Sequence, residues 1–151
     1  MDGKEVLYML AEHEKVIGDF YRALSRCFPD RRQFWERIAD EEYVHRDAVL
    51  SLLEPLENGA IRFTGRFNKT AITTSLNFVK ARTAAAEAGT IQQAEAFATA
   101  ASIEASLLER MGFDAFAGDA DELQRVKDKL LRETRLHHTM IVTEKDRANM
   151  K

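Results

Sequence analysis

The sequence predicts an all-α fold, a four-helix bundle of two antiparallel helix hairpins joined by a long crossover that contains a short extra helix. Helix-favouring residues are abundant, whereas the 151 residues include only seven glycines and two prolines. Four long segments carry apolar residues in alternating steps of three and four, the period of one helix face. Each of them begins with the spacing of a capping box. We expect a single domain over residues 1–151, with helices at about 3–28, 31–54, 73–88, 91–112 and 120–147.

The first helix is expected to begin at Asp2, which precedes Glu5 by three residues, as in a capping box. Its apolar stripe is interrupted once, by Glu14 near the middle. The stripe consists of Leu7, Leu10, Glu14, Ile17, Tyr21, Leu24 and Phe28. Taken alone, one such glutamate is most simply a partly exposed side chain.

The second helix follows a tight connection, since Asp30 and Gln33 repeat the capping-box spacing, and Pro55 is expected to end it. Two members of its stripe are ionisable. Glu42 and His45 are three residues apart, so both leave the helix in nearly the same direction. The stripe consists of Trp35, Ile38, Glu42, His45, Val49 and Leu52. Burial of an unpaired ion costs several kcal/mol, so these two groups need partners from other segments.

Residues 55–89 are expected to form the crossover, in which Asn58 and Gly59 signal a turn and Gly89 ends the short helix. The segment 61–69 mixes aromatic with basic side chains. We interpret it as a loop held by its aromatic residues, with the basic side chains in solvent, in preference to a phosphate or nucleotide contact.

Four apolar residues of the crossover have no place in the stripes of the long helices. They are Phe63, Phe67, Phe78 and Val79. We expect them to be exposed on a single chain and to become buried against a second copy. This predicts a homodimer or small homo-oligomer. The alternative is that they cover the flank of the bundle itself.

The third and fourth helices carry the remaining ionisable residues of this kind. The third begins at 90–93 and holds Glu104 alone in the interior of its stripe; the fourth begins at 119–122 and holds Glu133 and His137. The stripes consist of Ala94, Phe97, Ala101, Glu104, Leu108 and Met111, and of Leu123, Val126, Leu130, Glu133, His137 and Met140. Glu133 and His137 are four residues apart rather than three, a spacing that still keeps both on one face.

The ionisable residues of the four stripes all fall near the middle of their helices, at the height where neighbouring helices of similar length meet. They are Glu14, Glu42, His45, Glu104, Glu133 and His137. Without a cation, these buried groups would repel one another and lose hydration. Two divalent ions would offset the charge, and carboxylate oxygen with imidazole nitrogen suits iron or manganese, with zinc as an alternative. The other interpretation is a metal-free core of protonated glutamates hydrogen-bonded to histidines.

This pattern resembles the ferritin-like di-iron carboxylate proteins, and the rubrerythrin branch most of all. That family places a Glu from each of two helices, and a Glu-x-x-His or similar pair from each of the other two, around two irons. The resemblance covers about 1–54 and 90–147. The positions that match the family pattern are Glu14, Glu42, His45 and Glu104. Tyr21, one heptad beyond Glu14, would supply a proton or a hydrogen bond.

The chain departs from the family pattern at two points. Thr134 stands where the glutamate three residues before His137 would fall, and Glu133 is one position earlier. This spacing is consistent with a shifted metal site and equally with a weakened or single-metal site. Rubrerythrins usually also carry a rubredoxin-like domain with paired Cys-x-x-Cys motifs, whereas this chain has one cysteine, Cys27. Electrons would therefore come from a separate donor protein.

The resemblance implies a di-iron oxidoreductase that reduces peroxide or dioxygen. Two other functions stay open: iron storage or ferroxidase action in a larger assembly, and a metal-free ferritin-like structural scaffold. A net charge of -3 and a pI near 5.8 give no indication of a nucleic-acid surface. No stretch approaches the roughly 20 apolar residues of a membrane span, and no apolar run follows residues 1–5, so we expect a soluble, cytoplasmic protein.

Overall fold

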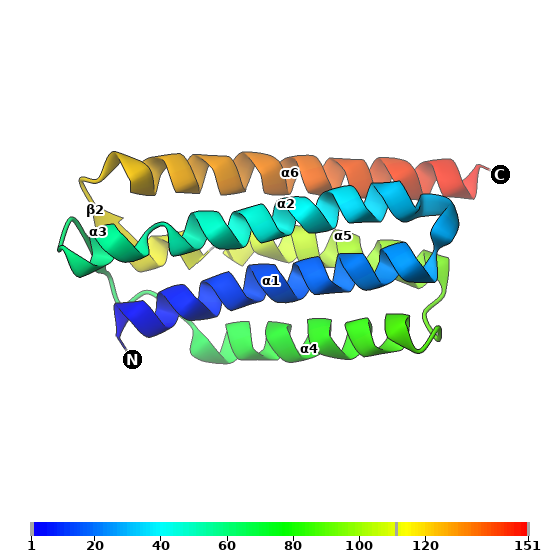
Figure 1. Ribbon diagram of the computed structural model, residues 1–151, viewed down its shortest axis with the longest axis horizontal. Coiled ribbons are helices and arrows are strands. Elements are labelled where there is room, and N and C mark those ends of the chain that lie inside the picture. Colours follow the sequence, from blue (N-terminus) through cyan, green and yellow to red (C-terminus); the bar gives the residue numbers. More distant parts are fainter. Residues whose placement is uncertain (1, 111, 151) are drawn as a thin grey trace.

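The computed structural model describes residues 2–110 and 112–150, and the protein is mostly helical, as its composition predicts. Five long helices run along the long axis of the molecule (Figure 1). They are α1 (Gly3–Cys27), α2 (Arg32–Leu50), α4 (Lys69–Glu87), α5 (Gln93–Arg110) and α6 (Asp121–Asn149). α1 packs against both α2 and α4, α5 packs against α6, and α2 contacts α6. None of the described helices combines the length and the hydropathy needed to cross a bilayer.

Only one of the predicted capping boxes forms its side-chain cap. Asp2 Oδ1 accepts a hydrogen bond from the Glu5 backbone N–H at 2.8 Å. α2 instead follows a 3-10 turn, η1 (Pro29–Arg31), and has no side-chain cap, and α6 begins after Ala120 without one. The Thr90 hydroxyl donates to a carbonyl at the end of α4. The predicted side-chain caps of α2 and α6 are therefore wrong, because this spacing also occurs in turns that end differently.

The helix predicted over 31–54 is divided in the structure. α2 ends in a turn, and a short helix, α3 (Leu53–Glu57), follows it. In the turn, Ser51 Oγ donates to the Ala48 carbonyl at 2.6 Å. Pro55 explains the break, because a proline lacks the N–H donor and its ring clashes with the carbonyl four residues earlier. In the first turn of α3 the missing donor costs nothing, since no helical partner exists there.

A small antiparallel sheet, which the sequence analysis did not predict, joins the crossover to the connection between α5 and α6. β1 (Ile61–Phe63) pairs with β2 (Phe116–Gly118), which follows the 3-10 turn η2 (Gly112–Ala115). Gly118 has a φ of +150°, and a Cβ there would overlap the carbonyl oxygen of Ala60. The strand pairing therefore requires glycine at this position. It brings together two segments that lie more than 50 residues apart along the chain.

α4 begins at Lys69, before the predicted start at 73, because the Asn68 side chain caps its first turn. It lies along α1 (Figure 1), and its Val79 is completely buried. Phe63 and Phe67 are partly buried against the core, and only Phe78 is largely exposed, at 48%. The predicted exposure of these apolar side chains is thus wrong for Val79, since the molecule covers its own flank there. The homodimer remains a prediction that Phe78 alone motivates.

Two apolar clusters fill the core and lie on either side of a polar layer. One cluster contains apolar residues from 16–24 of α1 and 35–39 of α2. The other contains apolar residues from 6–11 of α1, Val49 of α2 and Leu52 from the turn after it. On α6 the two clusters contribute Ile141 and Leu130. The layer between them consists of buried polar side chains, and it positions the candidate site.

Candidate metal centre

The buried polar layer contains five of the six side chains that the sequence analysis selected as metal ligands. They are Glu14 from α1, Glu42 and His45 from α2, Glu104 from α5 and His137 from α6. Glu14 is 5% exposed and the other four are completely buried. The stripes of α1, α2 and α6 produce this result directly, because each contributes apolar residues to the clusters on both sides of the layer.

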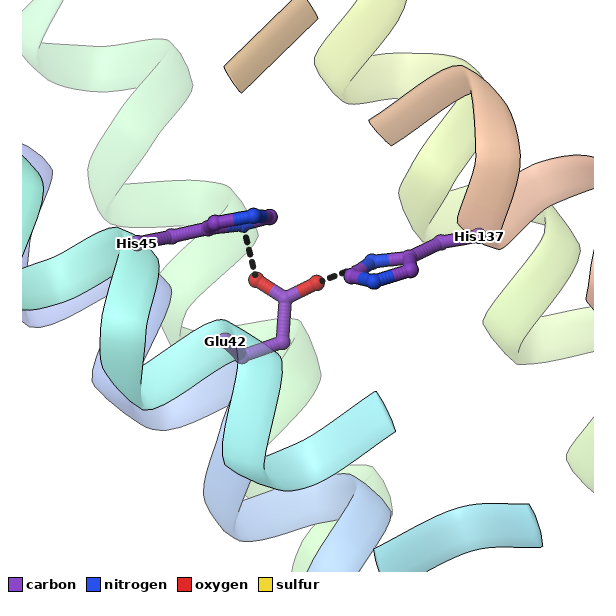
Figure 2. Close-up of side chains that lie close together, drawn as sticks. All are labelled: Glu42, His45 and His137. Atoms are coloured by element: carbon purple, nitrogen blue, oxygen red, sulfur yellow. Dashed lines mark hydrogen bonds and ion pairs between the residues drawn. The ribbon is translucent and has the colours of Figure 1, made fainter. Parts of the chain in front are cut away.

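Glu42 lies at the centre of the layer, between two imidazole rings (Figure 2). Its Oε2 is 3.4 Å from His45 Nδ1, and its Oε1 is 3.0 Å from His137 Nδ1. The two rings are nearly parallel, with an interplanar angle of 25° and centroids 5.4 Å apart. The Glu42 carboxylate of α2 therefore contacts imidazoles on two different helices, one through each oxygen.

Each imidazole also faces a second carboxylate through the same nitrogen. His45 Nδ1 is 3.8 Å from Glu14 Oε2, and His137 Nδ1 is 3.1 Å from Glu104 Oε1. The arrangement gives two sets of three donor atoms that share Glu42. The first donor set is Glu14 Oε2, Glu42 Oε2 and His45 Nδ1; the second donor set is Glu42 Oε1, Glu104 Oε1 and His137 Nδ1.

The outer nitrogen of each imidazole donates a hydrogen bond to a carboxylate on the opposite helix. His45 Nε2 donates to Glu133 Oε1 at 3.0 Å, and His137 Nε2 donates to Glu41 Oε2 at 2.6 Å. The Glu133 side chain is 20% exposed and also pairs with Lys129. The structure thus places Glu133, which the sequence analysis selected as a ligand, outside both donor sets. A carboxylate on the far nitrogen fixes the orientation and tautomer of an imidazole ligand.

Thr134, not Glu133, occupies the stripe of α6. It is 1% exposed, and it stands between Leu130 and His137 on the buried face. The run Glu41-Glu42-x-x-His45 of α2 aligns with the run Glu133-Thr134-x-x-His137 of α6. The first glutamate of each run contacts the outer nitrogen of the histidine in the other run. This alignment is the sequence signal that could have identified Glu41. It also shows that Thr134 takes the place corresponding to Glu42.

The carboxylates and imidazoles of the layer perturb one another strongly. Burial, followed by repulsion from Glu104 and Glu14, raises the pKa of Glu42 to about 8. Burial disfavours charged imidazoles, but contacts with the surrounding carboxylates outweigh it and raise the pKa of His45 to about 11 and that of His137 to about 10. In the absence of another cation, protons on the two imidazoles therefore compensate the charge of the carboxylates.

Three buried polar atoms of this layer have no hydrogen-bond partner among the described residues. They are Glu14 Oε2, Glu42 Oε2 and His45 Nδ1. They are also the three atoms of the first donor set. They face one another as ion pairs at 3.4 and 3.8 Å but lack hydrogen-bond geometry. A buried polar atom without a hydrogen bond is costly, by about 1–3 kcal/mol when it has no partner at all, so the group needs an explanation.

The spacing of the first donor set fits a divalent metal ion. Metal–ligand bonds of about 2.0–2.2 Å place neighbouring ligand atoms roughly 3–3.5 Å apart. His45 Nδ1 is 3.4 Å from Glu42 Oε2, within this range, and 3.8 Å from Glu14 Oε2, slightly beyond it. A compact group of donors, with one ligand atom of each residue within 4.8 Å of the others, consists of Glu42, His45 and His137, and it therefore joins residues of both donor sets. The residues present therefore fit an ion of this kind.

Tyr21, selected as a proton or hydrogen-bond donor, contacts the second donor set. Its hydroxyl donates to Glu104 Oε2 at 3.2 Å, and its ring stacks on Trp35 with centroids 5.7 Å apart. Burial, followed by the negative charge of Glu104, raises the pKa of Tyr21 well above its usual value. Tyr21 therefore stays protonated and holds the outer oxygen of Glu104.

His13 is a buried ionisable residue beside the site that the sequence analysis did not select. It is 8% exposed, and its Nε2 is 2.8 Å from Ser75 Oγ on α4. Burial lowers the pKa of His13, which keeps the ring neutral at physiological pH. The hydrogen-bond partner of His13 thus comes from α4, and His13 belongs to neither donor set.

Comparisons of the chain with family models, with curated proteins and with solved structures find no match. Any assignment of function therefore depends on the residues of this chain and their geometry.

Proposed function

We propose that this chain is a ferritin-like di-iron protein that binds two divalent metal ions, iron in the first place, at the two donor sets. The observation that carries the proposal is the group of unpartnered buried atoms in the first donor set, Glu14 Oε2, Glu42 Oε2 and His45 Nδ1. A bound cation would satisfy all three at once. It would also replace the protons that otherwise compensate the buried carboxylates.

We propose a ferritin-like four-helix bundle as the fold that holds the site. The four helices α1, α2, α5 and α6 supply every residue of the two donor sets and both outer carboxylates. α4 supplies none of them and packs along α1 as part of the crossover. This division of roles supports the resemblance on which the assignment rests.

The side chains of the site have distinct roles in this proposal. Glu42 is the shared ligand, and Glu41 and Glu133 hold the outer N–H of the imidazoles so that both Nδ1 atoms face inward. Bound iron supplies the electrons for reducing peroxide or dioxygen. Tyr21 holds a proton 3.2 Å from Glu104, at the edge of the second donor set. Re-reduction would need an external electron-donor protein.

The replacement of a glutamate by Thr134 makes the two donor sets unequal. Thr134 is buried beside His137 and offers no carboxylate. We therefore propose that the ion at the second donor set is held less tightly than the ion at the first.

A metal-free structural scaffold is the second candidate function, and one observation favours it. His137 is well satisfied without a metal, since its two nitrogens donate to Glu42, Glu104 and Glu41 at 2.6 to 3.1 Å. In this alternative the layer is a hydrogen-bonded polar core that only positions the helices. The unpartnered atoms around His45 are the observation that it leaves unexplained.

Metal content after anaerobic ferrous loading and desalting distinguishes the two functions. The di-iron proposal predicts up to two irons per chain, with Glu42→Gln retaining none. A chain that retains no iron, manganese or zinc after loading is a scaffold. If the loaded chain consumes hydrogen peroxide no faster than the same concentration of free ferrous ion, it binds metal but the oxidoreductase function is wrong.

A further inference from the structure

A pocket opens between α1, α4 and α5 and reaches the candidate metal centre. Its volume is about 580 Å³, and Glu14 of the first donor set forms part of its wall. Pockets that bind small molecules typically measure about 300–1,000 Å³. We call this hollow the α1–α4 pocket. Its size and its position beside a ligand residue make it the natural route by which an organic molecule could approach the site.

The interior of the α1–α4 pocket is suited to an apolar chain. Leu10, Phe67, Ile72 and Leu107 contribute apolar side chains from α1, the crossover, α4 and α5. The polar pair in the wall, His13 and Ser75, is already hydrogen-bonded at 2.8 Å and needs no partner from a ligand. An occupant that reaches toward Glu14 therefore gains most by burying apolar surface.

A second hollow next to the first provides positive charge. It has a volume of about 390 Å³ and lies beside the small sheet; Arg62, Arg66 and Lys127 contribute three cations to its wall, and Asp114 contributes one carboxylate. Arg66 and Asp114 line both hollows. Within the described part of the chain, none of the three cations forms an ion pair.

The charges at this end of the molecule favour an anionic group. In the second hollow Asp114 offsets one of the three positive charges and leaves an excess of two, whereas Glu14 and Glu109 line only the α1–α4 pocket. An arginine with no carboxylate partner can bind an incoming carboxylate through two parallel hydrogen bonds. Because Arg66 borders both hollows, a ligand held there by its anionic end can extend its apolar part into the pocket.

We propose that the chain binds an amphiphilic carboxylate, with the carboxylate at Arg66 and the apolar chain in the α1–α4 pocket pointing toward Glu14. The role of this ligand as a substrate of the metal centre rests on the proposed function. The binding itself depends only on the pocket and the cations. The inference thus names a substrate class, a medium-chain aliphatic acid, for a site whose metal chemistry is proposed separately.

Isothermal titration calorimetry of the metal-free protein with three compounds that differ in chain and charge tests the binding. Octanoate has both the chain and the charge, propionate has the charge alone, and 1-octanol has the chain alone. Octanoate should bind at least tenfold more tightly than either of the others. Equal affinity for octanoate and propionate, or no octanoate binding, would overturn the proposal.

Three variants locate the ligand. Arg66→Gln should weaken octanoate binding about tenfold, the loss expected for one charge-assisted hydrogen bond, and leave 1-octanol unchanged. Arg26→Gln is the matched control, since Arg26 is an exposed arginine at the other end of α1 and should bind octanoate like the wild type. Ala71→Trp should fill the pocket and weaken both octanoate and 1-octanol, with circular dichroism as the check on folding. An unchanged affinity in Arg66→Gln would place the ligand elsewhere and refute the assignment.

Cobaltous ion separates failure of this inference from failure of the proposed function. If the protein binds cobalt, octanoate should change the visible absorption of the bound ion, and Ala71→Trp should abolish that change. Octanoate binding without cobalt binding would support the proposed ligand pocket and show that the proposed metal centre is wrong. Binding of both without a spectral change would show that the ligand does not approach the metal, and the substrate role would be wrong.

Discussion

Glu42 is shared by the two donor sets, so substitutions in the site should remove metal-dependent stability in steps. Glu42→Gln keeps the shape of the side chain and deprives both sets of a carboxylate. Glu14→Gln affects only the first donor set. His137→Gln affects only the second, where it removes the inner nitrogen together with the outer contact to Glu41. The expected order of the remaining stabilisation is therefore wild type, then the two single-set variants, then Glu42→Gln.

The size of each step follows from linkage between binding and folding. An ion present at one hundred times its dissociation constant stabilises the folded state by about 2.7 kcal/mol. Two independent ions would contribute about 5 kcal/mol. For a chain of this length, about 1 kcal/mol shifts the melting temperature by about 2–4 °C. The wild type should therefore gain up to roughly 10–20 °C and Glu42→Gln almost nothing. The single-set variants should gain intermediate amounts, with the larger gain in His137→Gln, because it keeps the tighter first donor set.

The assay is thermal unfolding followed by circular dichroism, with chelator and with excess manganous ion. Glu36→Gln is the control, because Glu36 lies on the same helix and forms only an exposed ion pair with Arg32. Its loss should change little. A wild type that melts at the same temperature with and without metal would refute the reasoning. A full metal-dependent gain in Glu42→Gln would refute the shared-ligand geometry.

Four further predictions concern residues in and around the site. Thr134→Glu supplies a carboxylate next to His137 and should tighten binding at the second donor set, measured by metal titration. Glu41→Gln and Glu133→Gln should each weaken metal affinity about 10–100-fold while leaving the number of ions unchanged, in the same titration. Denaturant unfolding of the metal-free protein should show the contribution of Glu42 to stability being lost as pH rises from about 4.5 to 8, and that of His45 and His137 from about 6.5 to about 11 and 10, because all three hold protons in the folded state that the unfolded chain releases at lower pH. Gly118→Ala should destabilise the protein by about 1–3 kcal/mol in urea unfolding, through overlap with a neighbouring strand.

The buried faces of the first two helices were predictable because their stripes are regular. Every member of the second stripe is buried, including Leu52 just after α2, and in the first stripe only Phe28, just after α1, is partly exposed. The fourth helix shows the limit of the same method. Positions three and four residues before His137 both lie on its face, and the choice of Glu133 over Thr134 followed from residue type. The structure buries Thr134, because it lies four residues after Leu130 and three before His137, and so on the same helix face as both.

The two strands and the role of Glu41 could not be predicted from single segments, because both depend on contacts between distant parts of the chain. The strands have three residues each, too few for a periodic pattern, and depend on pairing across more than 50 residues. Glu41 resembled an ordinary surface residue of α2, since its role arises only when α6 brings His137 opposite it. The position of Met111 in the third stripe lies outside the described residues.

The crossed contacts between α2 and α6 link the two halves of the chain. Glu133 orients the imidazole of α2 and Glu41 orients that of α6, although these helices touch each other far less than α1 and α2 do. Neither half alone holds both a donor set and the carboxylate that orients its imidazole. Separation of the halves would therefore break up the second donor set and weaken binding at the first, and by the same equilibrium the ions would oppose separation. A higher concentration of metal ion would then make separation of α2 from α6 less favourable.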